Sequence, residues 1–330
     1  MKVLVTGATG AVGPRVVSAL LDAGCAVRTF SMDPPPAGAW PDGVEMLIGD
    51  VTDVAAVGAA VQGVDSVIHM AALLHIVNPP PTLREKYERV NVGGTSNVVN
   101  AAVRAGLRRV VIFSTIAVYG PSDGKIITES TPPNPDTFYA ETKLRAERIV
   151  LAAKDLQGRP MGTVLRLGAV YGSRIKGNYQ RLMQSLARGR FLPIGKGLNR
   201  RTLVYDKDVA LAAVAALKHP DAAGRIYNVS DGEYYSLDHI IAVMCQALGR
   251  KAPRWSLPVA PVRLAAGMIE KAMPLAGLNP PISRATIDKY TEDVAVDSRL
   301  IQRELGFAPK YDLPTGWKDA IREMRQSGEL

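Results

Sequence analysis

Short apolar runs alternate with segments of helical periodicity along the first half of the chain. Continuous apolar runs cover residues 2–6, 26–30, 44–48, 66–70 and 110–114, and helical patterns cover 12–23, 83–105 and 138–154. Apolar runs without alternation predict strands buried on both faces, as in a parallel sheet whose connections are helices. Because such connections are right-handed, the pattern predicts a doubly wound α/β sheet.

The amino-acid composition changes after an apolar run at residues 162–167. Glycine, proline and basic residues become denser, and helical patterns at 206–218, 237–248 and 298–305 lie between or after these stretches. We therefore predict a sheet domain over residues 1–170 and a smaller C-terminal α/β region over residues 171–330. The chain is expected to re-enter the first domain around residues 200–230.

Composition narrows the classes of protein that fit. The chain has 40 Lys and Arg residues against 31 Asp and Glu, a net charge of +9, and the basic residues are scattered. Scattered charge argues against a nucleic-acid-binding tail, so no nucleic-acid partner is expected. A solvated positive surface and attraction to a small polyanion both remain open.

Cysteines, histidines and the N-terminus give further expectations. Cys25 and Cys245 are too far apart for a disulfide framework, and His69 and His75 lack further ligands at metal spacing, so no metal is expected. An apolar stretch at residues 257–278 contains prolines and charged residues, too many to span a bilayer. The first residues read as a strand rather than a signal peptide. We expect a cytoplasmic protein without a transmembrane segment.

Three glycines follow the first predicted strand, in the stretch "TGATGAVG". Gly7 permits a sharp turn, Gly10 permits a close approach of the backbone to a pyrophosphate, and Gly13 permits packing of the next helix on the strand. The helix N-terminus adds free N–H groups and the positive end of a dipole. A tight turn without a ligand is the alternative. Its place after the first strand of an alternating pattern favours a dinucleotide and a Rossmann-type domain.

Other strand ends carry candidate cofactor contacts. The second strand ends at Ser31, with Asp33 two residues later, and no Lys or Arg follows that could bind a 2′-phosphate. This favours NAD over NADP. Asp50 and the segment "HMAA" also lie at the carboxyl ends of strands, where ligands of such sheets bind. Asp50 could equally be a turn residue at a helix N-terminus.

Tyr139 and Lys143 lie four residues apart in "FYAETKLRAE", on one face of a predicted helix. An ammonium group near a phenol is expected to lower the pKa of the tyrosine and to make it usable for proton transfer near neutral pH. Ser114 and Thr115 place hydroxyls at the end of the fifth strand, where one could hold a substrate oxygen. An exposed helical pair and hydroxyls that cap a turn are the structural alternatives.

These signals together resemble the extended short-chain dehydrogenase/reductase family, in its nucleotide-sugar epimerase and dehydratase group. The similar motifs are "TGATGAVG", "GDVTD", "NVGGT", "STIAVYG" and "YAETK". The resemblance implies that Thr115 takes the hydroxyl role, that Tyr139 is the acid/base, and that Lys143 binds the nicotinamide ribose. The cofactor contacts expected for NAD or NADP are Gly7, Gly10, Ala11, Val12, Gly13, Ser31, Asp50, Val51, Ala71, Ala72, Asn91, Tyr139 and Lys143.

The C-terminal half resembles the part of the family that binds a nucleoside-diphosphate sugar. The segment "RRTLVYDKDVA" implies that Arg201 holds the substrate diphosphate, and "KGNYQRLM" implies a contact from Asn178. The family has a second phosphate-binding arginine where this chain has Lys289, and the nearest arginine is Arg284. The resemblance also implies a homodimer that pairs the helices at 83–105 and 138–154.

Two reactions remain open within that group. Dehydratases have Asp–Glu where this chain has Ile116 and Ala117, so dehydration is not expected, and Ala169 replaces an asparagine found in many epimerases. Epimerisation at the sugar C4 and reduction of a 4-keto sugar nucleotide use the same machinery. A hydroxysteroid dehydrogenase or flavonoid reductase is a further alternative, with residues 257–278 as a lipophilic lid, a membrane-surface helix or an ordinary helix. The last alternative is a non-catalytic cofactor-sensing protein.

Overall fold

The computed structural model describes residues 1–74, 82–273 and 283–330. His75 and residues 274–278 of the apolar stretch lie outside the described residues. Within the described ranges, no helix combines the length and the apolar character needed to cross a membrane.

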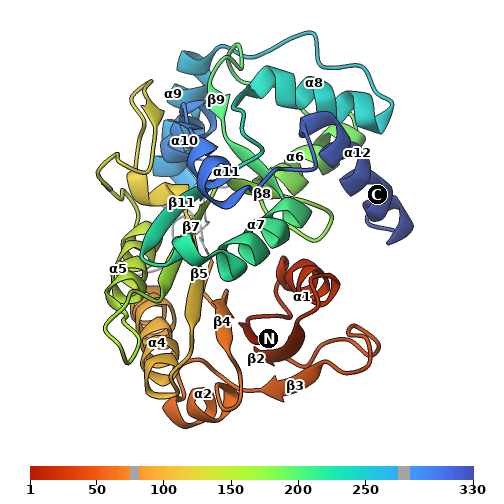
Figure 1. Ribbon diagram of the computed structural model, residues 1–330. Helices are drawn as coiled ribbons and strands as arrows, with labels where there is room; N and C mark the ends of the chain where they lie inside the picture. The colour runs from red at the N-terminus through yellow and green to blue at the C-terminus, as the bar shows by residue number, and fades with distance from the viewer. Residues whose placement is uncertain (75–81, 274–282) are drawn as a thin grey trace.

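A seven-stranded parallel sheet forms the centre of the sheet domain, as predicted (Figure 1). Its strands run in the order β11-β7-β5-β4-β1-β2-β3. Their bounds are β1 (Lys2–Thr6), β2 (Ala26–Ser31), β3 (Glu45–Ile48), β4 (Ser66–His69), β5 (Arg109–Thr115), β7 (Gly162–Leu167) and β11 (Arg225–Val229). The chain leaves β1 in one direction toward β3 and returns on the other side at β4. This reversal opens a crevice at the carboxyl ends of β1 and β4, where ligands of doubly wound sheets bind.

Helices cover both faces of the sheet, and each face has its own core. On one face lie α1 (Gly13–Asp22), α7 (Asp206–Lys218) and α11 (Arg299–Leu305), with Val16, Leu20 and Val209 packed on strand residues. On the other face lie α2 (Val54–Ala60), α4 (Thr95–Arg104) and α5 (Phe138–Ala152). Burial on both faces explains why the central strands are apolar without alternation.

The predicted helix over residues 83–105 is not continuous. It consists of α3 (Leu83–Tyr87), a π-helical segment η1 (Glu88–Gly94), and α4. The glycine pair "GG" lies in the π-helical segment, and a Cβ on Gly94 would come within 2.7 Å of a Val51 methyl group. The wider π turn therefore brings the backbone close to the loop after β3, which a regular helical pattern does not reveal.

The edge strand β3 also differs from the prediction of burial on both faces. All four of its residues are exposed, and Ile48 is 64 % exposed. The reason lies in the connection: no helix is formed between β2 and β3, so no helix from that connection covers the edge of the sheet.

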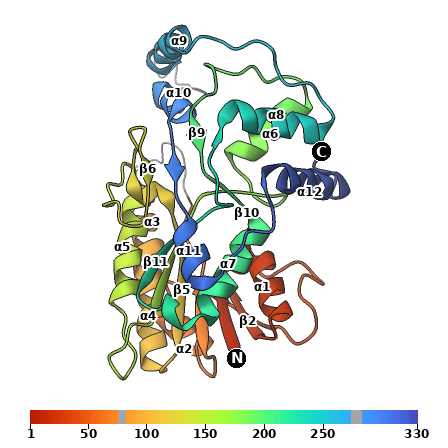
Figure 2. The same ribbon diagram turned by 45° about the horizontal axis from the view of Figure 1, so that its top comes forward.

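The remaining elements form a second body above the carboxyl edge of the sheet (Figure 2). They are η2 (Ile116–Tyr119), β6 (Ile126–Ile127), β8 (Ala169–Tyr171), α6 (Asn178–Ala187), β9 (Arg200–Arg201), β10 (Leu203–Tyr205), β12 (Tyr235–Ser236), α8 (Leu237–Leu248), α9 (Val259–Ala272), α10 (Arg284–Thr291), β13 (Ala295–Val296) and α12 (Leu313–Gln326). Their core gathers α6, α8 and α12 around Trp317, which is 1 % exposed. The short helix η3 (Pro220–Ala222) belongs to the sheet domain instead, where the Thr163 hydroxyl near the start of β7 donates to the carbonyl oxygen of Ala222. The boundary at residue 170 stays a prediction.

Candidate active site

The glycine turn between β1 and α1 is built as its sequence predicts. Gly7 has φ +71°, and its N–H donates to the carbonyl oxygen of Phe30 at 2.8 Å. A Cβ on Gly7 would lie 2.8 Å from the backbone nitrogen of Ala71, and a Cβ on Gly13 would lie 1.9 Å from the carbonyl oxygen of Ala8. Side chains are thus excluded at both ends of the turn, and α1 starts directly behind it. Ala11 and Val12 lie between Gly10 and this helix start.

Ser31 ends β2 beside the same turn. Its hydroxyl oxygen accepts a hydrogen bond from the backbone N–H of Thr9 at 3.2 Å, and the residue is 8 % exposed. The sequence contains no Lys or Arg from residue 31 to residue 50. A 2′-phosphate would therefore find no cation in this segment, so these residues fit NAD better than NADP. The glycine cradle that a Cβ would fill, at the N-terminus of α1, fits a dinucleotide diphosphate.

The loops after β3 and β4 place the next predicted contacts. The Asp50 carboxylate accepts from the N–H of Thr52 at 2.8 Å, so it forms a turn before α2, and Val51 packs beneath it at 5 % exposure. Ala71 and Ala72 follow β4 directly and are partly exposed. Their contacts with a cofactor stay a prediction.

Asn91 is buried and holds other parts of the site together. Its side-chain oxygen accepts from Leu73 N–H at 2.8 Å, and its amide nitrogen donates to the Leu73 carbonyl at 3.1 Å and to Thr142 Oγ1 at 3.2 Å. Thr142 in turn donates to the carbonyl oxygen of Tyr139 at 2.8 Å. The amide therefore ties the loop after β4 to the first turns of α5, where Tyr139 lies.

A buried histidine links the glycine turn to η1. Thr6 Oγ1 accepts from the N–H groups of Met70 and Ala71, so its proton points at His69 Nδ1, 2.7 Å away. The other ring nitrogen, Nε2, then carries the proton and donates to Thr95 Oγ1 at 3.0 Å. The Thr95 hydroxyl in turn donates to the carbonyl oxygen of Asn91 at 2.6 Å. Burial and the nearby charge of Lys143 lower the pKa of His69 to about 3.

This low pKa gives a prediction for acid stability. Below pH 6.5 the unfolded chain binds a proton on His69, whereas the folded chain binds it only near pH 3. The contribution of His69 to stability is therefore fully present above pH 6.5 and is lost as the pH falls toward 3. The slope should approach about 1.4 kcal/mol per pH unit. The free energy of unfolding, measured by urea denaturation from pH 7 to pH 5, should contain this contribution. The opposite contribution of Asp231 is superimposed on it, because burial raises the pKa of that carboxyl to about 6 and the folded chain takes up its proton first.

Two variants check the origin of that slope. His69→Gln removes the titrating ring and should change the slope of the unfolding free energy between pH 6.5 and pH 5 by up to about 1.4 kcal/mol per pH unit, although it lowers stability throughout. His239→Gln, at an exposed histidine, should leave the slope as it is in the unmodified protein. An unchanged slope in the His69 variant contradicts the assignment.

Tyr139 and Lys143 project from α5 at the same edge of the sheet. Both are placed by a helix whose start is capped by Thr137, which accepts from Ala140 N–H at 3.3 Å. The Tyr139 ring lies edge-on to Tyr87, with ring centroids 6.3 Å apart. Lys143 is 5 % exposed. Thr115 ends β5, the strand against which α5 packs, and its Oγ1 accepts from Ala117 N–H at 3.2 Å.

One electrostatic prediction for this pair is wrong. Burial, with Tyr87 nearby, raises the pKa of Tyr139 above its ordinary value instead of lowering it. Burial also lowers the pKa of Lys143 to about 8, against the opposing effect of the Glu147 carboxylate. Removal from water is the largest effect on the pKa of each group, so the phenol is held in its protonated form.

The carboxylate of Glu147 acts on Lys143 and was not among the residues predicted from the sequence. Glu147 is 1 % exposed and pairs with Arg166 of β7, N–O distance 2.6 Å. The signal was present: Glu147 lies four residues after Lys143 on the same helix, as Lys143 lies four after Tyr139. Its partner could not be read from the sequence because Arg166 belongs to a different element.

The predicted diphosphate ligands meet on the C-terminal side. Arg201 donates to the carbonyl oxygens of Lys289 at 2.6 Å and of Tyr290 at 2.9 Å. Lys289 Nζ forms ion pairs with Asp136 at 2.8 Å and with Glu292 at 3.1 Å. The structure thus brings Arg201 and Lys289 together, and it also engages both with acceptors of the chain itself. A bound phosphate would have to compete with these acceptors.

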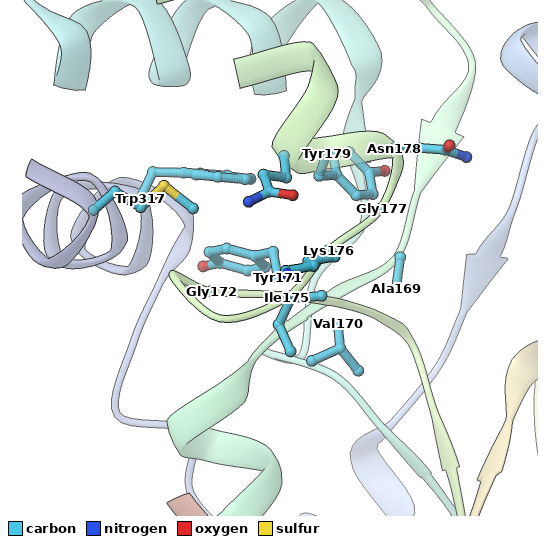
Figure 3. Close-up of a pocket in the computed structure, with 12 residues that line it drawn as sticks. Ala169, Val170, Tyr171, Gly172, Ile175, Lys176, Gly177, Asn178, Tyr179 and Trp317 are labelled. Carbon is cyan, nitrogen blue, oxygen red and sulfur yellow. The ribbon is translucent and has the colours of Figure 1, made fainter. Parts of the chain in front are cut away.

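A pocket of about 220 Å³ lies between β8, the start of α6 and α12 (Figure 3). The rings of Tyr171 and Trp317 stack at one end, with centroids 4.6 Å apart, and Asn178 lies at the opposite end. Asn178 is exposed and is the first residue of α6. The pocket therefore joins an aromatic wall to a helix N-terminus, which favours negative charge. Ala169, where many epimerases have asparagine, also lines it.

Several known proteins are similar to this chain over most of its length. The 3 beta-hydroxysteroid dehydrogenase/Delta 5→4-isomerase of Mycobacterium tuberculosis (strain ATCC 25618 / H37Rv) is 30 % identical over 322 residues, covering 94 % of this chain and 86 % of the relative. The UDP-glucose 4-epimerase of Vibrio cholerae is 28 % identical, covering 99 % and 96 %. The solved structure of MoeE5 in complex with UDP-glucuronic acid and NAD is 26 % identical, with a TM-score of 0.78, covering 99 % and 100 %.

A family model also matches most of the chain. Residues 3–230 match the model of the NAD dependent epimerase/dehydratase family, a span that runs from β1 through the glycine turn and the Tyr139–Lys143 helix to β11. The chain therefore belongs to the NAD dependent epimerase/dehydratase family.

Proposed function

We propose that this protein catalyses hydride transfer at C4 of a nucleoside-diphosphate sugar, as an epimerase or a 4-ketoreductase. The observation that supports it is the Tyr139–Lys143 pair, one helical turn apart at the carboxyl edge of the sheet, with Lys143 buried and Tyr139 half-buried. Family membership supports NAD as the cofactor. MoeE5, of similar structure, was solved with a UDP-sugar and NAD.

Each of the predicted site residues has a defined role in this proposal. The glycine turn and the N-terminus of α1 would hold the NAD diphosphate, and NAD, when bound, supplies reversible hydride acceptance. Tyr139, held protonated by its surroundings, donates its proton to the sugar 4-oxygen as a carbonyl becomes an alcohol, and takes it back in the reverse direction. Lys143 stabilises the phenolate that remains, and the Thr115 hydroxyl binds the same oxygen.

A second candidate is an NAD-dependent dehydrogenase of an apolar hydroxy or keto compound, such as a steroid. Two observations favour it. Ile116 and Ala117 are apolar where dehydratases have Asp–Glu, and Ala169 replaces an asparagine found in many epimerases. Arg201 and Lys289 are already engaged within the chain. The hydroxysteroid dehydrogenase relative also covers nearly the whole chain. The homodimer through α4 and α5 stays a prediction for either candidate.

Ligand-induced thermal stabilisation decides between the two substrate classes. With NAD present, UDP or a UDP-sugar at 100 times its dissociation constant should stabilise the protein by about 2.7 kcal/mol, and a hydroxysteroid should leave it unchanged. Lys289→Gln should weaken the response to UDP, and Lys251→Gln, at an exposed lysine outside the predicted site, should not. A response to the steroid alone contradicts the sugar proposal. Absorbance at the NADH band then separates a reductase, which consumes NADH, from an epimerase, which does not.

A further inference from the structure

A buried ion pair lies one helical turn below Lys143, away from the proposed substrate. Glu147 and Arg166 are 1 % and 2 % exposed. Arg166 Nε donates to both carboxylate oxygens of Glu147, at 3.0 and 3.2 Å, and its terminal nitrogen donates to one of them at 2.6 Å. Such a fork leaves the carboxylate little freedom to rotate.

Both partners are fixed from several other elements. Ser114, the neighbour of Thr115 on β5, donates its hydroxyl proton to Glu147 Oε1. The Arg166 guanidinium lies 4.6 Å above the centroid of the Tyr119 ring, and the Tyr119 hydroxyl donates to Asn228 Oδ1 of β11 at 2.8 Å. The carboxylate is therefore anchored to β5, to β7 and, through Tyr119, to β11.

A buried ion pair contributes little net stability, because the cost of desolvating both charges offsets their attraction. The location of this pair suggests another task. Lys143 and Glu147 project from the same face of α5, and the carboxylate acts on the Lys143 ammonium, opposing the effect of burial. The His69 ring also interacts with Lys143, but its pKa lies near 3, so it is neutral at neutral pH. Glu147 is the carboxylate that acts on the Lys143 ammonium.

We infer that Glu147, anchored by Arg166 and Ser114, is a positioning residue that keeps the Lys143 ammonium charged and in place beside Tyr139. The inference rests on the proposed function only for its catalytic consequence. The same anchor also fixes Ser114, so the carboxylate would set the position of the Thr115 hydroxyl and of the ammonium at once.

Direct titration of Lys143 tests this without any substrate. In protein labelled with ¹³C-lysine, the Lys143 signal is assigned with Lys143→Arg, and its midpoint in the unmodified protein should lie near pH 8. In Glu147→Gln the midpoint should fall by about one pH unit or more, because a nearby opposite charge has been removed. Glu147→Asp, which keeps the charge, should restore most of the shift. Glu141→Gln, an exposed carboxylate on the same helix, is the matched control and should leave both midpoint and activity unchanged.

If Glu147→Gln does not fold, the double variant Glu147→Gln/Arg166→Met removes both charges together and should still show a fall. This fall should be smaller, because the Arg166 cation, which also disfavours the Lys143 ammonium, is then absent. A midpoint unmoved in either folded variant overturns the inference and leaves the pair a purely structural one. With the substrate identified, the alkaline limb of kcat/KM should move by the same amount as the midpoint. An active Tyr139→Phe protein would refute the proposed function while leaving the titration of Lys143 as it is, so the two failures are distinguishable.

Discussion

Replacing Tyr139 by phenylalanine is expected to lower turnover by about 10²–10⁴-fold, the range typical for loss of a general acid or base. The phenol is the group that α5 presents at the carboxyl edge of the sheet, and burial raises its pKa, so it is a proton donor throughout the neutral range. Phenylalanine keeps the ring and its edge-on contact with Tyr87, 6.3 Å between centroids. The loss should therefore appear in kcat, because the chemistry lacks its proton while the site keeps its shape.

Two measurements separate a chemical defect from a structural one. NAD titration by fluorescence should give the same dissociation constant for Tyr139→Phe as for the unmodified protein, and the thermal midpoint should change little. Tyr234→Phe removes a hydroxyl from a ring packed under Arg200, 5.4 Å from guanidinium to centroid, and should keep full turnover. Turnover retained by Tyr139→Phe would remove this residue from the proposed reaction.

Gly13→Ala should both destabilise the protein and abolish tight binding of NAD. A methyl group at this position would lie 1.9 Å from the Ala8 carbonyl oxygen and 2.4 Å from its carbon. Both are backbone atoms, so α1 must move away from the turn. Overpacking of this kind costs about 3 kcal/mol or more where no flexible side chain can yield. Because the same movement displaces the helix N-terminus, NAD affinity should fall at least about tenfold.

A glycine elsewhere provides the control. Gly58 lies inside α2, and a Cβ there meets no atom within 4 Å. Gly58→Ala should therefore stabilise the protein by about 0.5–1 kcal/mol, the gain expected from backbone entropy alone. Urea unfolding and NAD titration on both variants measure the contrast. Equal NAD affinity in Gly13→Ala and the unmodified protein would show that the turn does not bind the dinucleotide.

Features that depend on neighbours in sequence could be predicted before the structure. The strand–turn–helix order around Gly7 predicted the sharp turn and the helix packed behind it, and the spacing of Tyr139 and Lys143 predicted that both lie on one face of a helix. Periodicity also gave the bounds of most strands of the sheet to within a residue or two. These are local properties, since a period of 3.6 or a sharp turn is fixed by a few adjacent residues.

What could not be predicted depends on groups far apart in the chain. The Glu147–Arg166 pair joins a helix to a strand, and its hydrogen bonds appear only when α5 packs on β7. The pKa of Tyr139 was assigned the wrong direction because a sequence shows the nearby ammonium but not the depth of burial. The exposed β3 was misjudged for a similar reason, since an apolar run does not say whether a helix covers it.

The late return of β11 to the sheet has a consequence for how the polypeptide acquires its structure. β11 hydrogen-bonds along the whole of β7, from Thr163 to Leu167, yet it is synthesised only after β8, α6, β10 and α7. Until then a nascent chain on the ribosome presents β7 as a bare apolar edge, which is a template for association with other chains. The sheet that begins at residue 2 is therefore complete only when residues 225–229 have been translated.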